Sequence, residues 1–176
     1  MISLIKPCEE YKEDIFKFKE EMIAAGNPEM YGTGFLQKYE TYEDWTASLD
    51  AFSDRNKIDP SSDCVEGSEY LLVDDERRRV LGMVHLRHYL NDFFLKLAGH
   101  IGYSVRPSER KKGYGKLQLE LALEKLAGLG VKEALVVCDS DNKASAKTIE
   151  SCGGVLENEI FAEEFDCFIK RYWIHT

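Results

Sequence analysis

Hydrophobic and polar residues alternate or recur at regular spacings along most of the chain, and these patterns predict its secondary structure. Strands are expected at residues 2–5, 69–73, 80–88, 99–105, 134–138, 155–162 and 165–175. Helices are expected at residues 7–25, 35–52 (with a break allowed near Thr41), 113–127 and 142–152, and residues 91–98 form a short helix or a loop. The polar residues 53–67 are expected to form a loop. No linker or repeat separates these elements, so we expect one domain spanning residues 1–176.

The stretch from Gly99 to Lys116 combines a strand, a basic turn and the start of a helix. Apolar and polar residues alternate up to Val105, and Pro107 cannot donate to a sheet ladder, so the strand should end there. The turn has the sequence Arg110-Lys111-Lys112-Gly113-Tyr114-Gly115, and Lys116 opens a run of strong helix formers. Free N–H groups and the dipole at a helix start attract anions, and glycines let a phosphate approach the backbone. The stretch therefore predicts an anion site.

Two well-known phosphate loops do not fit these residues. A Walker loop needs Ser or Thr after its lysine, whereas Leu117 follows Lys116. A dinucleotide-binding fingerprint needs a third glycine where this chain has Gln118. An ordinary solvated basic turn remains the alternative to anion binding.

Seven residues carry the most specific signal of this stretch: Ser104, Val105, Arg106, Pro107, Arg110, Gly113 and Gly115. In this order they resemble the coenzyme A pyrophosphate loop of the GNAT superfamily of N-acetyltransferases. The resemblance continues through the next strand and helix, and it covers about the C-terminal half of the chain well. It implies the α/β (α+β) fold of that family, with a mixed, mostly antiparallel central sheet of about seven strands flanked by helices. It also implies an acyltransferase that uses acetyl-CoA as its cosubstrate.

The resemblance implies two groups of contacts with coenzyme A. The strand edge at residues 103–105 would pair with the pantetheine amides, and the loop after it would bind the pyrophosphate. Polar residues at the opening of the next helix would lie near the pantetheine arm. The cofactor-binding residues implied in this way are Tyr103, Ser104, Val105, Arg110, Lys111, Lys112, Gly113, Tyr114, Gly115, Lys116, Asn142 and Ser145.

The resemblance defines the catalytic residues less well. Many family members carry a tyrosine as general acid seven residues after the asparagine, where this chain has Ile149. The base often lies on the strand before the valine, which leaves His100 and Tyr103 as the candidates there. An unshifted imidazole pKa of about 6.5 suits a base near neutral pH. His85 and His88 on the neighbouring strand are rivals, and histidines in strands are often structural.

Composition restricts the partners and the compartment. A net charge of −9 at pH 7 disfavours nucleic acid as a partner. If the acidic residues line a cleft, they would attract a cationic substrate such as an amine. The alternative is that they form a solvated acidic surface. No apolar run is long enough to span a bilayer, and the N-terminus does not resemble a signal peptide. Five widely spaced cysteines without a Cys-x-x-Cys pair argue against a metal site and a disulfide framework. We therefore expect a cytoplasmic protein without a membrane partner.

Two functions remain open. The first is acetyl transfer to an amine of a small molecule or peptide by direct attack in a ternary complex. In this case, Cys138 would be a buried apolar residue that carries no acetyl group. The second is a non-catalytic acyl-CoA-binding sensor or interaction module. Four aromatic residues either line the acceptor pocket or pack a helix onto the sheet: Tyr31, Tyr39, Tyr42 and Trp45. A homodimer is possible, and the sequence leaves open the acceptor and whether the acyl group is acetyl or longer.

Overall fold

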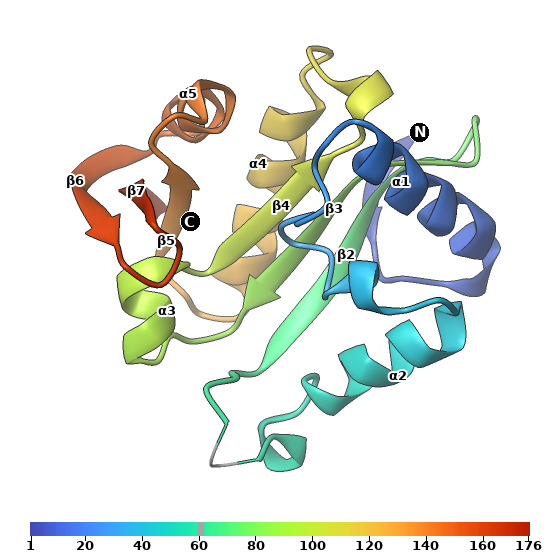
Figure 1. Ribbon diagram of the computed structural model, residues 1–176, viewed down its shortest axis with the longest axis horizontal. Coiled ribbons are helices and arrows are strands. Elements are labelled where there is room, and N and C mark those ends of the chain that lie inside the picture. The colour runs from blue at the N-terminus through green and yellow to red at the C-terminus, as the bar shows by residue number, and fades with distance from the viewer. Residues whose placement is uncertain (60–61) are drawn as a thin grey trace.

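Seven strands form one sheet in the computed structural model, which describes residues 1–59 and 62–176 (Figure 1). The strands are β1 Ile2–Ile5, β2 Gly67–Asp74, β3 Arg79–Arg87, β4 Ile101–Val105, β5 Glu133–Asp139, β6 Val155–Ala162 and β7 Cys167–His175. Their order across the sheet is β1-β2-β3-β4-β5-β7-β6. Every neighbouring pair is antiparallel except β4 and β5, which run parallel. This arrangement confirms the expected mixed, mostly antiparallel sheet.

Five α-helices and four 3-10 helices occur within the described residues. The α-helices are α1 Lys12–Ala24, α2 Tyr42–Ala51, α3 Asp92–Leu97, α4 Tyr114–Gly128 and α5 Lys143–Ser151, and the 3-10 helices are Glu9–Tyr11, Leu36–Lys38, Arg55–Lys57 and Pro107–Glu109. None of the described helices is long and apolar enough to cross a membrane.

The helix expected at residues 35–52 is two separate elements, and the break lies at Thr41. This residue has an extended backbone, and its side chain accepts a hydrogen bond from the N–H of Asp44, so it caps the start of α2. The predicted loop at residues 53–67 contains a 3-10 turn, and β2 begins at its last residue. Pro60 and Ser61 of that loop lie outside the described residues.

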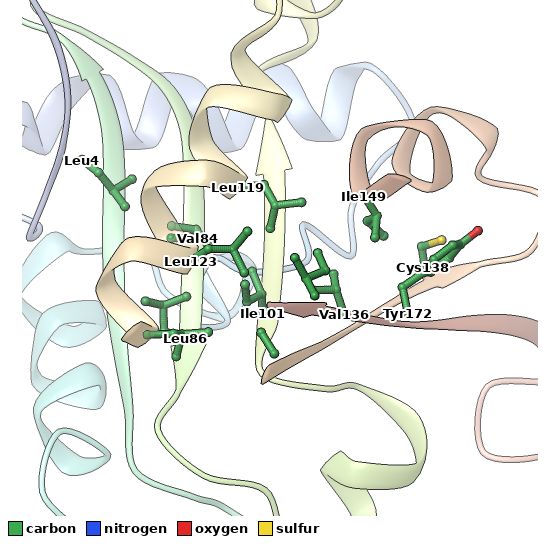
Figure 2. Packing of buried hydrophobic residues seen from close by; sticks show 14 of the residues in the cluster. Leu4, Val84, Leu86, Ile101, Leu119, Leu123, Val136, Cys138, Ile149 and Tyr172 are labelled. Carbon is green, nitrogen blue, oxygen red and sulfur yellow. The ribbon is translucent and has the colours of Figure 1, made fainter. Parts of the chain in front are cut away.

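Helices cover both faces of the sheet. On one face, α4 and α5 pack over an apolar cluster that includes Leu72, Leu119 and Ile149 (Figure 2). On the other face, α1 and α2 pack over a second cluster that includes Leu71 and Trp45. Leu71 and Leu72 are neighbours in β2 and point to opposite faces, as the pleat of a strand requires. Burial of each such leucine stabilises the fold by roughly 2 kcal/mol.

β4 pairs with β3 along its whole length, but it pairs with β5 only at its first residue, where Ile101 lies opposite Val136. Just before this point, the N–H of His100 donates to the carbonyl of Leu135 over 2.7 Å, and Gly99 forms an isolated bridge with Val136. No further pairing of β4 with β5 occurs among the described residues. The edge of β4 beyond Ile101 is therefore left unpaired in the middle of the sheet.

The chain between α1 and α2 crosses directly over the backbone of β4. The hydroxyl of Ser104 donates to the carbonyl of Tyr31 over 2.6 Å. Gly32 has a positive φ of 73°, and a Cβ atom at this position would lie 2.0 Å from the carbonyl oxygen of Gly102. Only glycine combines this backbone conformation with such a close approach of two chain segments.

We predict that Gly32→Ala lowers the free energy of unfolding by roughly 3 kcal/mol or more, because the new methyl group has to push the crossing segment away from β4. Gly26→Ala is the matched control, since Gly26 has the same φ of 73° and open space around its Cβ position. The control should cost only about 1 kcal/mol for the left-handed backbone. Urea unfolding of both variants measures the difference, and equal losses would contradict the close contact.

Candidate active site

A cavity of about 140 Å³ lies where β4 and β5 separate, and residues from both faces of the sheet line it. Its lining consists of Tyr31, Gly32, Arg87, Leu97, Ala98, Ile101, Gly102, Tyr103, Val137, Cys138, Asp139, Asn142, Ser145, Phe165 and Ile169. A more open hollow of about 630 Å³ lies at the start of β5, beside the end of β7, and shares none of these residues. The first cavity is the candidate site because the unpaired edge of β4 borders it.

The pairing of β4 with β3 decides which backbone groups face the cavity. The N–H of Arg106 donates to the carbonyl of Leu81 in β3. Because hydrogen-bonded residues alternate along an antiparallel pair, the backbone groups of Ser104 also face β3, whereas those of Tyr103 and Val105 face the side of β5. Of the three strand residues predicted to contact pantetheine, Tyr103 and Val105 therefore present their backbone to the cavity side.

Three side chains with exchangeable protons lie together on the α5 side of the cavity. The hydroxyls of Tyr103 and Ser145 are 2.9 Å apart, and the hydroxyl of Ser145 also interacts with the thiol of Cys138. Burial raises the pKa of Tyr103 to about 12 and that of Cys138 to about 11, so both groups keep their protons at neutral pH. Asn142 caps α5 by accepting a hydrogen bond from the N–H of Ser145 at 3.1 Å, which orients this end of the helix.

The loop before α4 leaves room for an anion at the helix start. Gly113 precedes α4 with a φ of 87°, a conformation that favours glycine. A Cβ atom at Gly115 would make only ordinary contacts of 3.6–3.7 Å, with Thr148 and Val105. The first N–H groups of α4 have no partner within the helix, so they are available to a bound phosphate.

The same loop carries less free positive charge than its sequence indicates, because three of its four basic side chains contact other protein groups. Arg110 donates to the carbonyl of Val105 over 3.1 Å and to the side chain of Asn27 over 2.6 Å. Lys112 and Lys116 form ion pairs with nearby glutamates at 2.9 and 3.6 Å. Lys111, with a φ of 64°, forms no ion pair within the described part of the chain.

Buried ion pairs fasten this loop to α1. Arg106 is only 3% exposed and donates to Asp14 and to Glu21, in both cases over 2.7 Å. The other carboxylate oxygen of Glu21 accepts the N–H of Ser108 at 2.6 Å. Burial alone would raise the pKa of Glu21, but the hydrogen bonds from Ser108 and Arg106 lower it to about 2. The loop is thus positioned in part by Glu21, a carboxylate that is ionised at neutral pH.

His100, one of the two predicted catalytic residues, lies at the point where β4 and β5 separate. Its imidazole Nδ1 accepts a hydrogen bond from the backbone N–H of Leu135 over 3.0 Å, and its backbone N–H donates to the backbone carbonyl of Leu135. It is 7% exposed and does not line the cavity, and burial lowers its pKa to about 4. These contacts favour a structural role for His100, whereas Tyr103, the second predicted residue, lines the cavity.

The rival histidines also lie outside the cavity lining. Nδ1 of His85 is 3.1 Å from the carboxyl group of Glu69. Burial raises the pKa of Glu69 well above its usual value and lowers that of His85 to about 3, so the imidazole is uncharged at neutral pH. His88 contacts the hydroxyl of Ser68 at 2.9 Å and the carboxylate of Glu66 at 3.4 Å.

Among the four aromatic residues considered for an acceptor pocket, only Tyr31 lines the cavity. Trp45 is fully buried, and its indole N–H donates to the carbonyl of Thr33 over 3.0 Å. Tyr39 and Tyr42 pack against the cluster beneath α1 and α2. For these three residues, the contacts favour the alternative in which they pack a helix onto the sheet.

Two charged residues of the cavity were not identified from the sequence. Arg87 ends β3 and Asp139 ends β5, and no motif marks either position. The position of Asp139 at the end of a buried strand beside the predicted binding strand was the only available signal. Within the described residues, no group of three or more His, Cys, Asp or Glu side chains could hold a metal ion.

The chain matches one protein-family model. That model is described as an acetyltransferase (GNAT) domain, and it matches residues 5–155. No curated protein matches the sequence.

Solved structures similar to this chain are acetyltransferases. One is the ribosomal-protein-S5-alanine acetyltransferase of Vibrio fischeri, with 17% identity, a TM-score of 0.72, and coverage of 99% of this chain and 91% of that one. Another is a ribosomal L7/L12 alpha-N-protein acetyltransferase in complex with coenzyme A, with 15% identity, a TM-score of 0.70, and coverage of 99% and 93%. A spermidine N-acetyltransferase of Vibrio cholerae has 16% identity, a TM-score of 0.65, and coverage of 99% and 93%. At these identities, the likeness shows a shared fold.

We predict that His100 acts on stability and not on the reaction. His100→Ala leaves the buried N–H of Leu135 without an acceptor and should lower the free energy of unfolding by about 1–3 kcal/mol. His100→Asn places an amide oxygen near the position of Nδ1 and should retain most of this stability.

The titration of His100 gives a second readout. The pKa of His100 is about 4 in the folded protein and about 6.5 in the unfolded chain. Between about pH 4 and pH 6.5, the unfolded chain therefore binds more protons than the folded protein. Stability should fall as the pH drops from about 6.5 to 4, and less steeply in His100→Asn. Denaturant unfolding across this range measures the effect. A folded His100→Asn protein with turnover reduced a hundredfold would instead restore the role as base.

Proposed function

Because the chain belongs to the family of acetyltransferase (GNAT) domains, we propose that it transfers an acetyl group from acetyl-CoA to an amine of a small molecule or peptide, by direct attack in a ternary complex. One observation carries this proposal. The unpaired edge of β4 connects the anion site at the start of α4 with a cavity that contains both hydroxyl and thiol groups. A thioester with a long arm and a diphosphate at its far end needs such an arrangement.

The proposed coenzyme position follows from the same geometry. The pyrophosphate lies against the N–H groups of the first turn of α4, near Gly113 and Gly115, and Lys111 adds charge from solvent. The pantetheine arm extends along β4 and forms hydrogen bonds with the backbone of Tyr103 and Val105, as an added strand would. Asn142 and Ser145 border the arm from α5. Support comes from the open space at Gly115 and from the free edge of β4.

The proposed chemistry forms one N–C bond and breaks one C–S bond. A neutral amine attacks the thioester carbon, and the N–H of Tyr103 is available to the oxyanion that develops. When the intermediate collapses, the Tyr103 hydroxyl donates a proton to the departing thiolate and recovers one through Ser145. The raised pKa of Tyr103 supports this role, since the hydroxyl is protonated at neutral pH. Ile149, fully buried, has no proton to give. Holding both reactants in line contributes several further kcal/mol.

The remaining parts of the proposal concern the whole protein. One domain comprises residues 1–176, since one sheet includes strands from both ends of the chain. Five free cysteines and a net charge of −9 support a cytoplasmic location and a partner other than nucleic acid. A homodimer stays a prediction.

We predict that Gly115→Asp weakens binding of coenzyme A by roughly tenfold or more, because a carboxylate would face the pyrophosphate. Gly115→Asn is the matched control, since it adds nearly the same volume without the charge, and it should bind coenzyme A much more tightly than the Asp variant. Titration calorimetry with coenzyme A gives both affinities. Unchanged affinity in a folded Gly115→Asp protein would place the pyrophosphate elsewhere.

We predict steady release of free coenzyme A when acetyl-CoA is mixed with a panel of primary amines, with intersecting initial-rate patterns that indicate a ternary complex. Cys138→Ala should keep most of the turnover, because the high pKa of this thiol makes it a poor nucleophile. Parallel rate patterns, or an acetylated Cys138 trapped in mass spectrometry, would contradict direct attack. Binding of acetyl-CoA without turnover of any amine would favour the sensor alternative.

A further inference from the structure

The cavity extends to the face of the sheet opposite Tyr103 and Cys138. Side chains alternate along β5, so Val137 and Asp139 point away from the face to which Cys138 contributes. The segment at Tyr31 and Gly32 borders the cavity on this second face. A molecule that enters here approaches the end of the proposed coenzyme arm from the side that the coenzyme leaves free.

Only two of the cavity-lining residues within the described chain carry a formal charge at neutral pH, and the two charges are opposite: Arg87 and Asp139. The other lining residues are apolar, neutral polar or glycine. Opposite charges in one small, mostly apolar cavity restrict the acceptor more strongly than the overall acidity of the protein does.

Arg87 is a half-buried arginine that forms no ion pair among the described residues. One of its nitrogens donates to the carbonyl of Gly99 over 3.0 Å, and its guanidinium carbon lies 4.3 Å from the ring centre of Phe94. Glu69 is the carboxyl group that acts on it most strongly, but Glu69 forms no ion pair with Arg87 among the described residues and bonds instead to His85. Burial lowers the pKa of Arg87 to about 10, which still leaves it charged at neutral pH.

A comparison with Arg106, which is buried, shows that Arg87 is unusual here. Arg106 forms two ion pairs of 2.7 Å, with Asp14 and Glu21. A buried cation is costly unless an anion compensates it. Among the described residues, Arg106 has two carboxylates at ion-pair distance and Arg87 has none, which is the pattern expected when the anion belongs to a ligand.

Asp139 is the corresponding negative group. Its closest side-chain partner is the thiol of Cys167, at 3.9 Å, and it forms no ion pair within the described chain. Burial, followed by the nearby Asp141, raises its pKa. A carboxylate with an elevated pKa and without a cationic partner can hold an ammonium group and accept a proton from it.

We propose that the acceptor is a small zwitterionic amine, of the α-amino acid class, whose ammonium group binds Asp139 and whose carboxylate binds Arg87. This inference rests on the proposed acetyl transfer. Asp139 takes one proton from the ammonium, and the neutral nitrogen then attacks the thioester carbon as the N–C bond forms and the C–S bond breaks. The nitrogen loses a second proton to solvent, and Tyr103, which has given its proton to the sulfur, regains one from solvent through Ser145. The net products are the N-acetyl amino acid, free coenzyme A and one proton.

Matched pairs of acceptors test the role of Arg87. Each pair differs by one carboxylate: alanine and ethylamine, serine and ethanolamine, phenylalanine and 2-phenylethylamine, with spermidine and a tripeptide as further amines. In the wild-type protein, kcat/KM for the best amino acid should exceed that of its decarboxylated partner by roughly 10- to 100-fold, as expected for a charged hydrogen-bonded pair. Arg87→Gln should remove this ratio, and Arg87→Lys should retain part of it.

The role of Asp139 is tested in parallel. Asp139→Asn should lower kcat with every acceptor by roughly a hundredfold, while Asp92→Asn, which removes an exposed carboxylate outside the cavity lining, should change it by about twofold at most. Coenzyme A affinity should stay unchanged in all these variants, since neither side chain borders the proposed pyrophosphate site. The inference is overturned if the decarboxylated amines, spermidine or the tripeptide are acetylated as well as the amino acids, or if Arg87→Gln keeps the wild-type ratio.

Failure of the proposed acetyl transfer can be distinguished experimentally from failure of the zwitterion proposal. If coenzyme A binds and no amine is acetylated, acetyl transfer is excluded, but calorimetric titration of the same amino acids onto the coenzyme A complex still decides the acceptor. Binding that is weakened by Arg87→Gln and Asp139→Asn would support the zwitterion site. Absence of binding by any amino acid would overturn it.

Discussion

The single contact between β4 and β5 is the constraint on which the candidate site depends. Ile101 lies opposite Val136, and the backbone and imidazole of His100 hold Leu135 just before that point. If the two strands paired further, β4 would have no free edge and the cavity would close. If they did not pair at all, the sheet would divide into two parts with exposed edges. Because β4 and β5 pair at one position and then separate, the sheet is continuous and still has an opening between these two strands.

The two ends of the proposed coenzyme site use different physics. At the start of α4, the protein offers backbone N–H groups, while most basic side chains are engaged by its own carboxylates and carbonyls. Glu109, for example, is 3% exposed and also accepts hydrogen bonds from Arg77 and Arg79 at 3.0 and 2.9 Å. These contacts hold the loop in shape before any ligand arrives. At the other end, the Tyr103 hydroxyl and the Cys138 thiol have raised pKa values, so they stay protonated and uncharged at neutral pH.

The distribution of buried charge separates structural from functional roles in this protein. Arg106 and Glu21 neutralise one another and link the loop before α4 to α1. Glu69 and His85 are hydrogen-bonded to one another, and burial disfavours the charged form of each. Arg87 and Asp139 differ from both cases, since each borders the cavity without an ionic partner among the described residues. Charges left in this state fit a ligand that brings its own counter-charges.

Local patterns in the sequence determined most elements of this protein. β1 and β6 have the predicted bounds, Thr41 breaks the helix where a break was allowed, and Asn142 opens α5, because alternation, caps and glycines act within a few residues. The glycine-containing loop before α4 was likewise predicted from a local sequence pattern. Only the tertiary structure decided that His100 bonds to Leu135, that Arg110 turns back to Val105, and that Arg87 and Asp139 share a cavity. These contacts join residues on different elements. They depend on strand order, on register and on the point where two strands separate, and no local pattern encodes these three features.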